Sequence, residues 1–536
     1  MQNVELEQIF RARAQLRARW HREGWYRNES VGQTLMRLAR ERPDTPFHFH
    51  TEHGLRRSST AEIVGDGARM ARALAAIGIR PGDVVAFQLP TSYETAVLYA
   101  AAFCAGATVL PIVHFYGPAE VGFILRRARA RALIVPDRWR HVDYLERLSA
   151  LGDTPDLEHV IIVGERAPAG AQTLARLREK AADPVPVPKQ DPDATCLMLF
   201  TSGTTGEPKG VQQTHNTLTC EWYIPNFLRK PGTFLNPTPA GHIQGFNFLM
   251  RPMVRGYPVV HMDRWDAPVA AELIDRLGVN QSGGAPYFLL TLVEAARAGG
   301  HSLASLRQFG LGGATVTPEH VRMADRLGII AGRTYGSSEH STVSSYDAAM
   351  SLERRSMTDG KILPGTEVRI VDDEDRDLPF GSDGEILLIG PEQFPAYLDD
   401  VHNRTSFTAD GWFRSGDVGC VDAQGFLTIT DRKKDLIIRG GENISSMEVE
   451  NILITHPAVA EAAVVAMPDP RFGERVCAYA VLKPGAQLDF EQMRAHYAAS
   501  GFAKQKTPEH LVLVSELPRT PTGKIRKNEL RARLRA

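Results

Sequence analysis

Short apolar runs rich in β-branched residues alternate with stretches of helical periodicity over the first half of the chain. The runs lie at 83–89 (DVVAFQL), 107–113 (ATVLPIV), 132–136 (ALIVP), 159–164 (HVIIVG) and 257–262 (YPVVHM). Among the helical stretches, GARMARALAAIGI places Met70, Leu74 and Ile77 on one helix face. Strands that are apolar throughout and alternate with helices predict parallel sheets covered by helices on both sides.

The pattern changes after about residue 365, where short strands and turns dominate (TEVRIVD, GEILLIG, GWFRSGDVG, GFLTITD). A further unit follows Asp431, with a strand LIIRG, a helix opening at SSMEVENIL, two more strands and a helical tail. Ser445 and Glu448 fit a capping box at that helix start. We therefore predict an α/β protein. Its large N-terminal domain (1–431) has parallel sheets flanked by helices plus a small β-rich subdomain, and its mobile α+β C-terminal domain covers 432–536.

Length and charge narrow the class of protein. The 536 residues exceed the ~250–300 at which single cores stop growing, so two or three packed units are expected. Lys plus Arg number 62 against 63 Asp plus Glu, which gives no electrostatic reason to expect a nucleic-acid or anionic-membrane partner.

The cysteines and the N-terminus bear on location. The five cysteines are scattered without a C-x-x-C pair, so neither a disulfide framework nor a zinc site is expected. The N-terminal segment mixes acids and bases without the apolar run of a signal peptide. No stretch approaches the ~18 apolar residues of a membrane span. We expect a cytoplasmic protein without integral membrane contact.

A glycine- and hydroxyl-rich loop follows an apolar run in LMLFTSGTTGEPKGVQQTH (197–215). Glycines let backbone N–H groups approach an anion, hydroxyls add donors, and a lysine adds positive charge, so the loop suits a polyphosphate. It is not a Walker A loop, because Lys209 precedes Gly210. The alternative is a surface turn. The candidate phosphate ligands are Thr201, Ser202, Gly203, Thr204, Thr205, Gly206 and Lys209.

The loop sequence TSGTTGEPKG resembles the phosphate-loop signature of the adenylate-forming (AMP-binding) superfamily, in its acyl-CoA synthetase or carboxylate–CoA ligase branch. Four further segments resemble family motifs in the same order: YGSSE (335–339), GWFRSGDVG (411–419), DRKKDLIIRGGENI (431–444) and PRTPTGKIRK (518–527). The resemblance covers the chain from about residue 30 to its end.

The resemblance implies a nucleotide site. Glu339 would hold Mg²⁺ against the phosphates, Tyr335 would stack on adenine, and Asp417 would bind both ribose hydroxyls. Arg432 would add a donor to ribose or phosphate. Taken alone, Glu339 could be a solvated loop acid and Tyr335 a core aromatic. Asp417 could be an ordinary turn aspartate, and Arg432 could belong to a solvated basic cluster. The remaining candidates are Gly312, Gly313 and Ala314 along the adenine, and Gly336, Ser337 and Ser338 near the α-phosphate, with Ser338 in place of the usual Thr.

The resemblance also implies a moving catalytic lysine. Lys524, in the turn-forming Thr-Pro-Thr-Gly-Lys, would bridge the substrate carboxylate and the α-phosphate. Lys434 matches the family's hinge, about which the C-terminal domain rotates. That rotation would bring Gly440, Gly441 and Glu442 to line the thiol channel. The implied catalytic set is Lys524, Glu339, Lys209 and Thr204.

The acyl pocket is expected within TPAGHIQGFNF (238–248), at His242, Ile243, Gly245 and Phe246, with SGGAP (282–286) alongside. His242 could instead be a hydrogen-bonded core histidine. Arg251 and Arg255 are expected on the outer face of a helix, which leaves a mostly apolar pocket for a monocarboxylic acid. Ile243 stands where siderophore-type ligases for ortho-hydroxybenzoates usually have Asn, which argues against them. The motif spacing and the N-terminal segment WHREGWYRNESV resemble those of medium-chain, alicyclic or aromatic acyl-CoA ligases, which implies such an acid.

The predicted function is activation of a carboxylic acid to acyl-AMP by ATP and Mg²⁺, then transfer to coenzyme A. Loading of a carrier-protein phosphopantetheine thiol is the alternative within the same fold. A non-catalytic nucleotide-binding regulator is the alternative of another class, and Lys524 argues against it because a binder needs no such lysine. The sequence leaves the acid, the thiol acceptor and the oligomeric state open.

Overall fold

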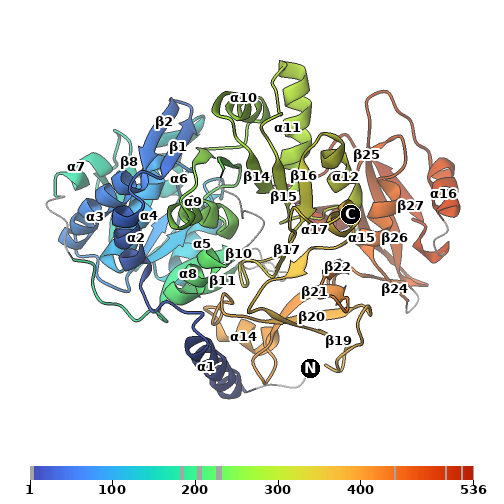
Figure 1. Ribbon diagram of the computed structural model, residues 1–536, viewed down its shortest axis with the longest axis horizontal. Coiled ribbons are helices and arrows are strands. Elements are labelled where there is room, and N and C mark those ends of the chain that lie inside the picture. The colour runs from blue at the N-terminus through green and yellow to red at the C-terminus, as the bar shows by residue number, and fades with distance from the viewer. Residues whose placement is uncertain are drawn as a thin grey trace.

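The computed structural model describes residues 5–180, 186–201, 208–224, 232–439, 442–500, 504–520 and 523–534. Its main sheets are two of seven strands, one of four and one of five. The C-terminal unit, orange to red in Figure 1, lies at one side of the large unit, and the four-stranded sheet lies below the centre. The α/β class, with large parallel sheets and a smaller C-terminal unit, is confirmed.

The first large sheet has the order β16-β15-β14-β12-β13-β1-β2. Neighbouring strands run parallel except for the edge hairpin of β1 and β2. Its strands are β1 (Pro46–Thr51), β2 (Gly54–Ser59), β12 (Phe234–Asn236), β13 (Val259–Met262), β14 (Gln281–Gly284), β15 (Gln308–Leu311) and β16 (Ile330–Arg333). The predicted strand at 257–262 is therefore a parallel strand of this sheet.

The second large sheet has the order β11-β10-β4-β3-β5-β8-β9, again parallel except at one edge, between β10 and β11. Its strands are β3 (Val84–Phe87), β4 (Thr108–Pro111), β5 (Ala132–Pro136), β8 (His159–Val163), β9 (Gln172–Thr173), β10 (Thr195–Thr201) and β11 (Lys209–Thr214). The four apolar runs predicted between 83 and 164 are confirmed as its central strands.

One apolar core joins the two sheets. It contains Phe47 and Val259 from the first sheet, and Val85 and Ile134 from the second. Helix α4 (Tyr93–Ala105) is buried along almost its whole length, as expected of a helix that is apolar all round. The helices of the large unit include α2 (Val31–Glu41), α3 (Thr60–Ala76), α4 (Tyr93–Ala105), α5 (Pro118–Ala128), α8 (His215–Tyr223), α9 (Ile243–Arg255), α10 (Ala267–Leu277), α11 (Pro286–Gly299) and α12 (Pro318–Arg326).

Helix α3 confirms the predicted helical face, because Met70 and Leu74 are buried and Ile77 packs against the same core. Its contact with α4 is close at Gly67, where an added Cβ would lie 2.7 Å from the Cβ of Ala100. A larger side chain at position 67 would therefore push the two helices apart.

The β-rich unit is the antiparallel sheet β19 (Glu367–Val371), β20 (Gly384–Ile389), β21 (Phe413–Val421) and β22 (Leu427–Arg432). A buried ion pair fixes it to the first large sheet. Arg333, at the end of β16, donates to both carboxylate oxygens of Asp359, at 2.9 and 2.6 Å. Asp359 also accepts from the backbone N–H of Ile429 in β22 at 2.8 Å.

The C-terminal unit has its own core around Val449, Val464 and Tyr497. Ser445 accepts from the Glu448 N–H at 3.1 Å, which confirms the predicted helix start, but the carboxylate of Glu448 binds Lys506 rather than completing the capping box. The elements are β23 (Ile437–Arg439), β24 (Glu442–Ile444), α15 (Ser446–Leu453), β25 (Val459–Asp469), β26 (Gly473–Leu482), α16 (Phe490–Ala499), β27 (His510–Leu513) and α17 (Lys527–Arg533).

Helix α1 (Leu6–Arg22) packs on α14 (Asp400–Ser406), below the β-rich unit in Figure 1. Its buried Arg13 donates to the carbonyls of Pro395, at 2.8 Å, Gly411, at 3.0 Å, and Phe394. One N-terminal arginine thus holds together two loops that lie almost 400 residues away in the sequence.

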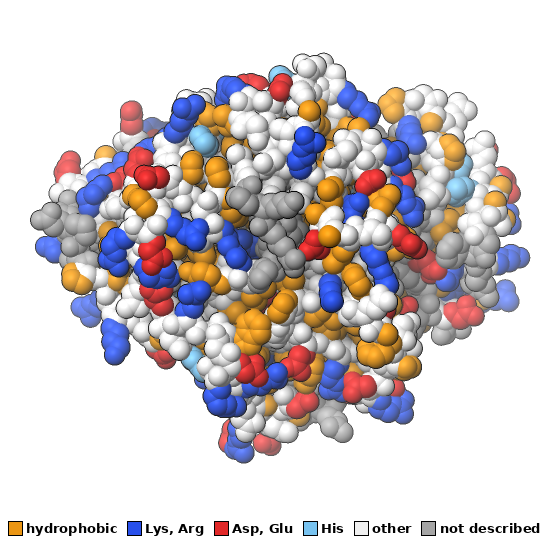
Figure 2. Space-filling view, in the orientation of Figure 1, with side chains coloured by type: hydrophobic (Ala, Val, Ile, Leu, Met, Phe, Trp, Pro, Cys, Tyr) orange, Lys and Arg blue, Asp and Glu red, His pale blue; other side chains and the backbone are white. Residues whose placement is uncertain are grey.

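The surface carries charges of both signs, interspersed on the face shown in Figure 2. All five cysteines are free thiols, as expected. In the described part of the chain, no helix is both long and apolar enough to cross a membrane.

Candidate active site

Residues from each predicted motif line one cleft of about 2670 Å³ that reaches from the large sheets to the C-terminal unit. Gly312 to Ala314 follow β15, and Tyr335 to Glu339 follow the neighbouring parallel strand β16. Both segments therefore emerge at the carboxyl edge of the sheet, where open α/β sheets bind ligands. Thr201 reaches the same cleft from the end of β10 in the second sheet.

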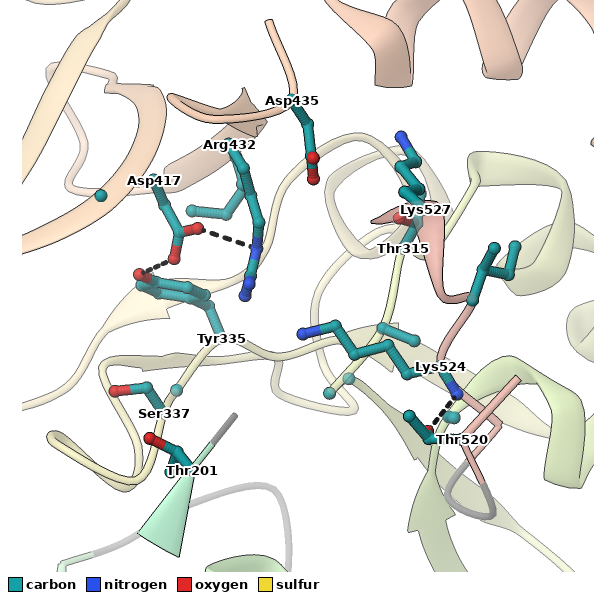
Figure 3. Close-up of a pocket in the computed structure, with 18 of the residues that line it drawn as sticks. Thr201, Thr315, Tyr335, Ser337, Asp417, Arg432, Asp435, Thr520, Lys524 and Lys527 are labelled. Carbon is teal, nitrogen blue, oxygen red and sulfur yellow. Dashed lines mark hydrogen bonds and ion pairs between the residues drawn. The ribbon is translucent and has the colours of Figure 1, made fainter. Parts of the chain in front are cut away.

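Tyr335, Asp417 and Arg432 form a hydrogen-bonded row at one side of the cleft (Figure 3). The Tyr335 hydroxyl donates to Oδ2 of Asp417 at 2.6 Å, and Nε of Arg432 lies 3.1 Å from Oδ1. Asp417 and Arg432 face each other across the β21–β22 ladder, so the sheet register sets their separation. Burial and the neighbouring carboxylate raise the pKa of Tyr335 well above its ordinary value, so the phenol stays a donor.

Glu339 and Lys209 meet through Tyr397. The Tyr397 hydroxyl donates to Oε1 of Glu339 at 2.6 Å, and Nζ of Lys209 lies 5.1 Å from the centre of the Tyr397 ring. Burial lowers the pKa of Lys209, while the charge of Glu339 opposes that shift. Sequence analysis missed Tyr397, because a lone tyrosine in an irregular segment carries no signal of its own.

The YGSSE turn is fixed by its own side chains. The hydroxyl of Ser337 accepts from the N–H groups of Glu339 and His340, both at 3.2 Å. A Cβ on Gly336 would lie 2.1 Å from the carbonyl oxygen of Ser341, so only glycine fits there. Gln213 donates to the carbonyl of Ser338 at 2.8 Å. These contacts orient Glu339 toward the cleft.

The segment 312–314 is equally constrained. Gly312 donates to the carbonyl of Gly284 at 3.1 Å, and an added Cβ would come within 2.6 Å of the Thr334 hydroxyl. Gly313 has φ of +75°, a conformation that favours glycine. The backbone of this segment, with Ala314, therefore forms a smooth wall of the cleft.

Part of the phosphate loop lies outside the described residues, namely Ser202, Gly203, Thr204, Thr205 and Gly206. Its two ends are described, since Thr201 and Lys209 face each other as the last pair of the β10–β11 ladder. Gly440 and Gly441 of the predicted thiol channel also lie outside the described residues. Glu442 is exposed on β24 and is not among the residues lining the cleft.

Lys524 extends into the cleft, with its ammonium directed toward Arg432 and Tyr335 (Figure 3). Its loop is closed by the Thr520 N–H, which donates to the Lys524 carbonyl at 2.7 Å, and by the Lys524 N–H, which donates to the Thr520 hydroxyl at 3.1 Å. Repulsion by Arg432, then burial, then Lys434, lowers the pKa of Lys524 to about 8. The side chain is exposed to the cleft and stands beside two cations, Arg432 and Lys434.

The lysine loop rests directly on the large unit. Gly523 has φ of +83°, and a Cβ there would lie 2.9 Å from the Cβ of Tyr287 in α11. Arg519 donates to the carbonyl of Gly523 at 2.7 Å, with its guanidinium 5.8 Å from the Tyr287 ring centre. Lys434 is exposed and lines the same cleft. This arrangement presents Lys524 to Arg432 and Tyr335, whereas Glu442 does not line the cleft.

The expected acyl-pocket residues divide between the cleft and the core. His242 and Ile243 line the cleft, and burial lowers the pKa of His242 to about 4, so its ring is neutral. Phe246 packs in the core, 5.8 Å from the ring of Tyr99. Gly245 packs directly against the backbone of Pro239, because an added Cβ would lie 2.0 Å from the Pro239 carbonyl oxygen. The helix face toward the cleft instead carries Gln244, Asn247, Phe248 and Arg251.

The expected outer position of Arg251 is wrong. Arg251 is 4% exposed, lines the cleft and forms an ion pair with Glu221 of α8. Helix α9 is buried continuously from Gly245 to Val254, so it has no solvent face at this point. The sequence alone predicts exposure because arginines are rarely buried unless they are paired. The partner of Arg251 is Glu221, which lies 30 residues earlier in the chain.

Comparison with known proteins agrees with the geometry. A family model for AMP-binding enzymes matches residues 35–398, and one for the C-terminal domain of AMP-binding enzymes matches residues 448–524. The chain belongs to the AMP-binding enzyme family, which confirms the resemblance inferred from its motifs.

Relatives are similar over nearly their full lengths. The medium-chain fatty-acid–CoA ligase of Escherichia coli K12 is 34% identical over 526 residues, which cover 96% of this chain and 92% of that protein. A salicylyl-CoA synthase / salicylate adenylyltransferase of Streptomyces sp is 32% identical, covering 96% and 95%. The crystal structure of the anthranilate CoA ligase AuaEII with anthranoyl-AMP superimposes with a TM-score of 0.85 at 25% identity, covering 95% and 98%.

Proposed function

We propose that this protein is an AMP-forming acid–thiol ligase that converts a carboxylic acid to its coenzyme A thioester. The observation that carries the proposal is the convergence of Lys524, Arg432 and Asp417 in one cleft with Glu339 and Lys209. A site for nucleotide alone would not need a lysine brought in from a separate C-terminal unit. The names of the relatives, which are CoA ligases acting on fatty and aromatic acids, support coenzyme A as the acceptor.

In the first step, a carboxylate oxygen of the acid attacks the α-phosphorus of ATP, and the bond from that phosphorus to pyrophosphate breaks. Negative charge grows on the phosphoryl oxygens and on the leaving group. Lys524 would neutralise charge between carboxylate and α-phosphate, and Lys209 with the 201–206 loop would hold the departing phosphates. In the second step a thiolate attacks the acyl carbonyl and AMP leaves, which forms the thioester.

The nucleotide would be held by the residues around it. We assign the adenine to the wall of Gly312, Gly313 and Ala314 and to the ring of Tyr335, and the ribose to Asp417. Arg432 lies beside Asp417 and would contact ribose or phosphate. The 336–338 turn, with Ser338 at the α-phosphate, completes the set, together with Thr201 to Gly206 of the phosphate loop.

Glu339 fits a magnesium ion held together with phosphates. Among the described residues, no group of three His, Cys, Asp or Glu side chains could hold a metal on its own. A single carboxylate that faces a phosphate site matches the preference of Mg²⁺ for one or two carboxylates plus phosphate oxygens. When bound, the ion would neutralise charge on the phosphates, and Tyr397 would hold the carboxylate in place.

We place the boundary of the moving C-terminal domain between Asp431 and Arg432, with Lys434 as the hinge. Sheet membership supports a hinge at Lys434, because β22 ends at Arg432 in the β-rich unit and β23 begins at Ile437 in the C-terminal sheet, although it keeps Arg432 itself with the β-rich unit. Rotation there would withdraw Lys524 and bring the segment 440–442 toward the acyl-AMP.

The acyl group would extend from the nucleotide past His242 and Ile243, which line the cleft. The proposed acids are medium-chain, alicyclic or aromatic. The relatives act on both fatty and aromatic acids, as their names state. A cytoplasmic location is proposed on the free thiols.

The test is a panel of carboxylic acids incubated with the purified protein, MgATP and CoA, with AMP and acyl-CoA measured together. Steady release of AMP with matching acyl-CoA is expected. AMP or pyrophosphate formation that stalls after one turnover with CoA would favour a carrier-protein thiol instead. Protein that makes neither product with any acid would refute the ligase.

A further inference from the structure

The acyl side of the cleft contains a polar cluster deep beside its apolar wall. Glu221, Asn247, Arg251 and Thr342, here called the polar floor, all line the same cleft as His242. They come from α8, α9 and the segment after the YGSSE turn. Buried charges in an otherwise apolar pocket are costly to keep, so this cluster calls for an explanation.

The polar floor is built around one ion pair. Arg251 binds Oε1 of Glu221, and the Thr342 hydroxyl donates to the same oxygen at 3.1 Å. Asn247 is anchored by the Trp222 indole, which donates to its Oδ1 at 2.9 Å. The four side chains are therefore held in fixed positions before any ligand arrives.

One donor of the floor is unused. Nε of Arg251 is buried and has no hydrogen-bond partner within the described parts of the chain. Buried donors are nearly always paired, by protein or by another molecule. Arg251 makes its ion pair with Glu221, while burial raises the pKa of the Glu392 carboxyl. The floor as a whole is close to neutral but retains hydrogen-bonding capacity.

The floor's arginine lies further along α9 than His242, which we take as the mouth of the proposed acyl pocket. Arg251 follows His242, the N-cap of α9, by nine residues, which is about 13 Å along the helix axis. Because helical side chains lean toward the N-terminus, the guanidinium lies somewhat nearer the mouth than its Cα. Ile243 and Phe248 line the cleft between these two levels. A ligand would thus pass Ile243, Gln244 and Phe248 before it reaches the ion pair of Arg251 and Glu221.

We propose that the polar floor binds a neutral hydrogen-bonding group, a hydroxyl or a carbonyl, at the far end of the acid's hydrocarbon body. The inference rests on the proposed ligase function and narrows its substrate class. A second carboxylate would face Glu221, and an ammonium would face Arg251, so a charged terminus fits less well. A plain hydrocarbon terminus would leave the floor desolvated without a partner.

The test compares matched acids on the full-length enzyme with MgATP and CoA. The pairs are hexanoate with 6-hydroxyhexanoate, octanoate with 8-hydroxyoctanoate, and benzoate with 4-hydroxybenzoate, each with its dicarboxylate analogue. We expect kcat/KM for the hydroxylated acid to exceed that of its plain partner by about tenfold in at least one pair. If kcat/KM is higher for the plain acid in every pair, the inference is wrong but the proposed ligase function stands. If no acid is turned over, the proposed ligase function itself is wrong.

A double variant tests the residues. Removing one partner of a buried pair strands a charge, so Glu221→Leu and Arg251→Met are combined. The double variant should reverse the preference in favour of the plain acid. Arg255→Met is the matched control, because Arg255 lies one turn further on α9 and donates to the carbonyls of Trp222 and Ile224 outside the cleft lining. An unchanged preference in the double variant would show that the ion pair only holds α8 to α9.

Discussion

The phenolic hydroxyl of Tyr335 donates to Oδ2 of Asp417 at 2.6 Å, and this bond ties the loop after β16 to the β-rich sheet. Arg432 takes the other carboxylate oxygen at 3.1 Å. Each ionised carboxylate has about four acceptor sites, so Asp417 can still accept from a ribose. Two units of the protein thus hold Tyr335, Asp417 and Arg432, the proposed nucleotide contacts, in place before any ligand binds.

That bond separates two roles of Tyr335. Tyr335→Phe keeps the ring and loses the bond to Asp417, whereas Tyr335→Ala loses both. Stacking of a base on an aromatic ring is worth about 1–3 kcal/mol, so we expect Tyr335→Ala to raise KM for ATP roughly tenfold or more beyond the increase that Tyr335→Phe causes by losing the bond to Asp417. Steady-state kinetics at saturating acid gives both values. If Tyr335→Phe and Tyr335→Ala raise KM for ATP equally, the Tyr335 ring does not stack on the adenine.

Lys524→Ala should separate the two half-reactions. Loss of one well-placed cation in such a site costs about 3–4 kcal/mol, or a hundred- to a thousandfold in the rate of adenylation. Pyrophosphate exchange measures adenylation, and thioester formation from supplied acyl-AMP measures the second step. The second step should largely survive. Equal loss of both would contradict a domain that alternates between two positions.

Adenylation should fall at alkaline pH. Fixed cations lower the pKa of Lys524 to about 8, and the protonated form is the one that can neutralise phosphate. Above that pH the free enzyme loses the proton, so kcat/KM for pyrophosphate exchange should fall toward tenfold per pH unit and be flat on the acid side of this group.

The same repulsion between cations predicts which variant shifts the pH profile of adenylation. Lys434→Gln removes one of the two cations that depress the pKa of Lys524, so the alkaline limb should shift to higher pH. Lys433→Gln is the control, since Lys433 pairs with Glu385 and Asp373 and is not among the groups acting on Lys524. A shift with Lys433→Gln, or none with Lys434→Gln, would reject this electrostatic account.

Tyr397→Phe should weaken use of MgATP. It removes the 2.6 Å hydrogen bond to Glu339, and bonds to charged groups contribute about 1.5–3 kcal/mol, so kcat/KM for MgATP should drop at least tenfold. Tyr497→Phe is a matched control, because its hydroxyl makes a buried 2.7 Å bond to the Val449 carbonyl inside the C-terminal core. If the two variants lose the same activity, Tyr397 acts through stability alone.

The sequence predicted the centre of the fold better than its edges. Runs such as 132–136 are apolar throughout, and only a strand buried on both faces needs that composition. The antiparallel pairs at the sheet edges, β1 with β2 and β10 with β11, were not foreseen, because the direction of a short strand depends on its connection and partner.

The site residues also divide into those that a continuous motif reveals and those that depend on distant contacts in the fold. Lys524, Glu339 and Asp417 stand in continuous motifs, so the sequence could single them out, and the structure gathers them in one cleft. Tyr397 lies 58 residues from Glu339, and its role depends on a loop position that no local pattern encodes. Arg251 was misplaced for the same reason, since its burial is tolerable only with Glu221 beside it.

Arg13→Met should destabilise the protein although it lies far from the cleft. The substitution removes the donor for the carbonyls of Pro395, Phe394 and Gly411, and each buried acceptor left without a partner costs about 1–3 kcal/mol. Thermal unfolding should therefore begin several degrees lower. Activity should also fall at limiting MgATP, because Phe394 donates to the carbonyl of Glu339 at 2.8 Å and its displacement would move that carboxylate.

Arg11→Met provides the comparison on the same helix. Arg11 is exposed and, among the residues that the structure describes, pairs with Glu7, one turn earlier, through a 2.8 Å contact. Such exposed pairs contribute little to stability, so the unfolding temperature and KM for ATP should match the wild type. A melting temperature for Arg13→Met equal to that of Arg11→Met would show that α1 is not anchored through Arg13. A loss of stability without any change in KM for ATP would instead confine its role to folding, because the path from Phe394 to Glu339 would then carry no effect on the nucleotide site.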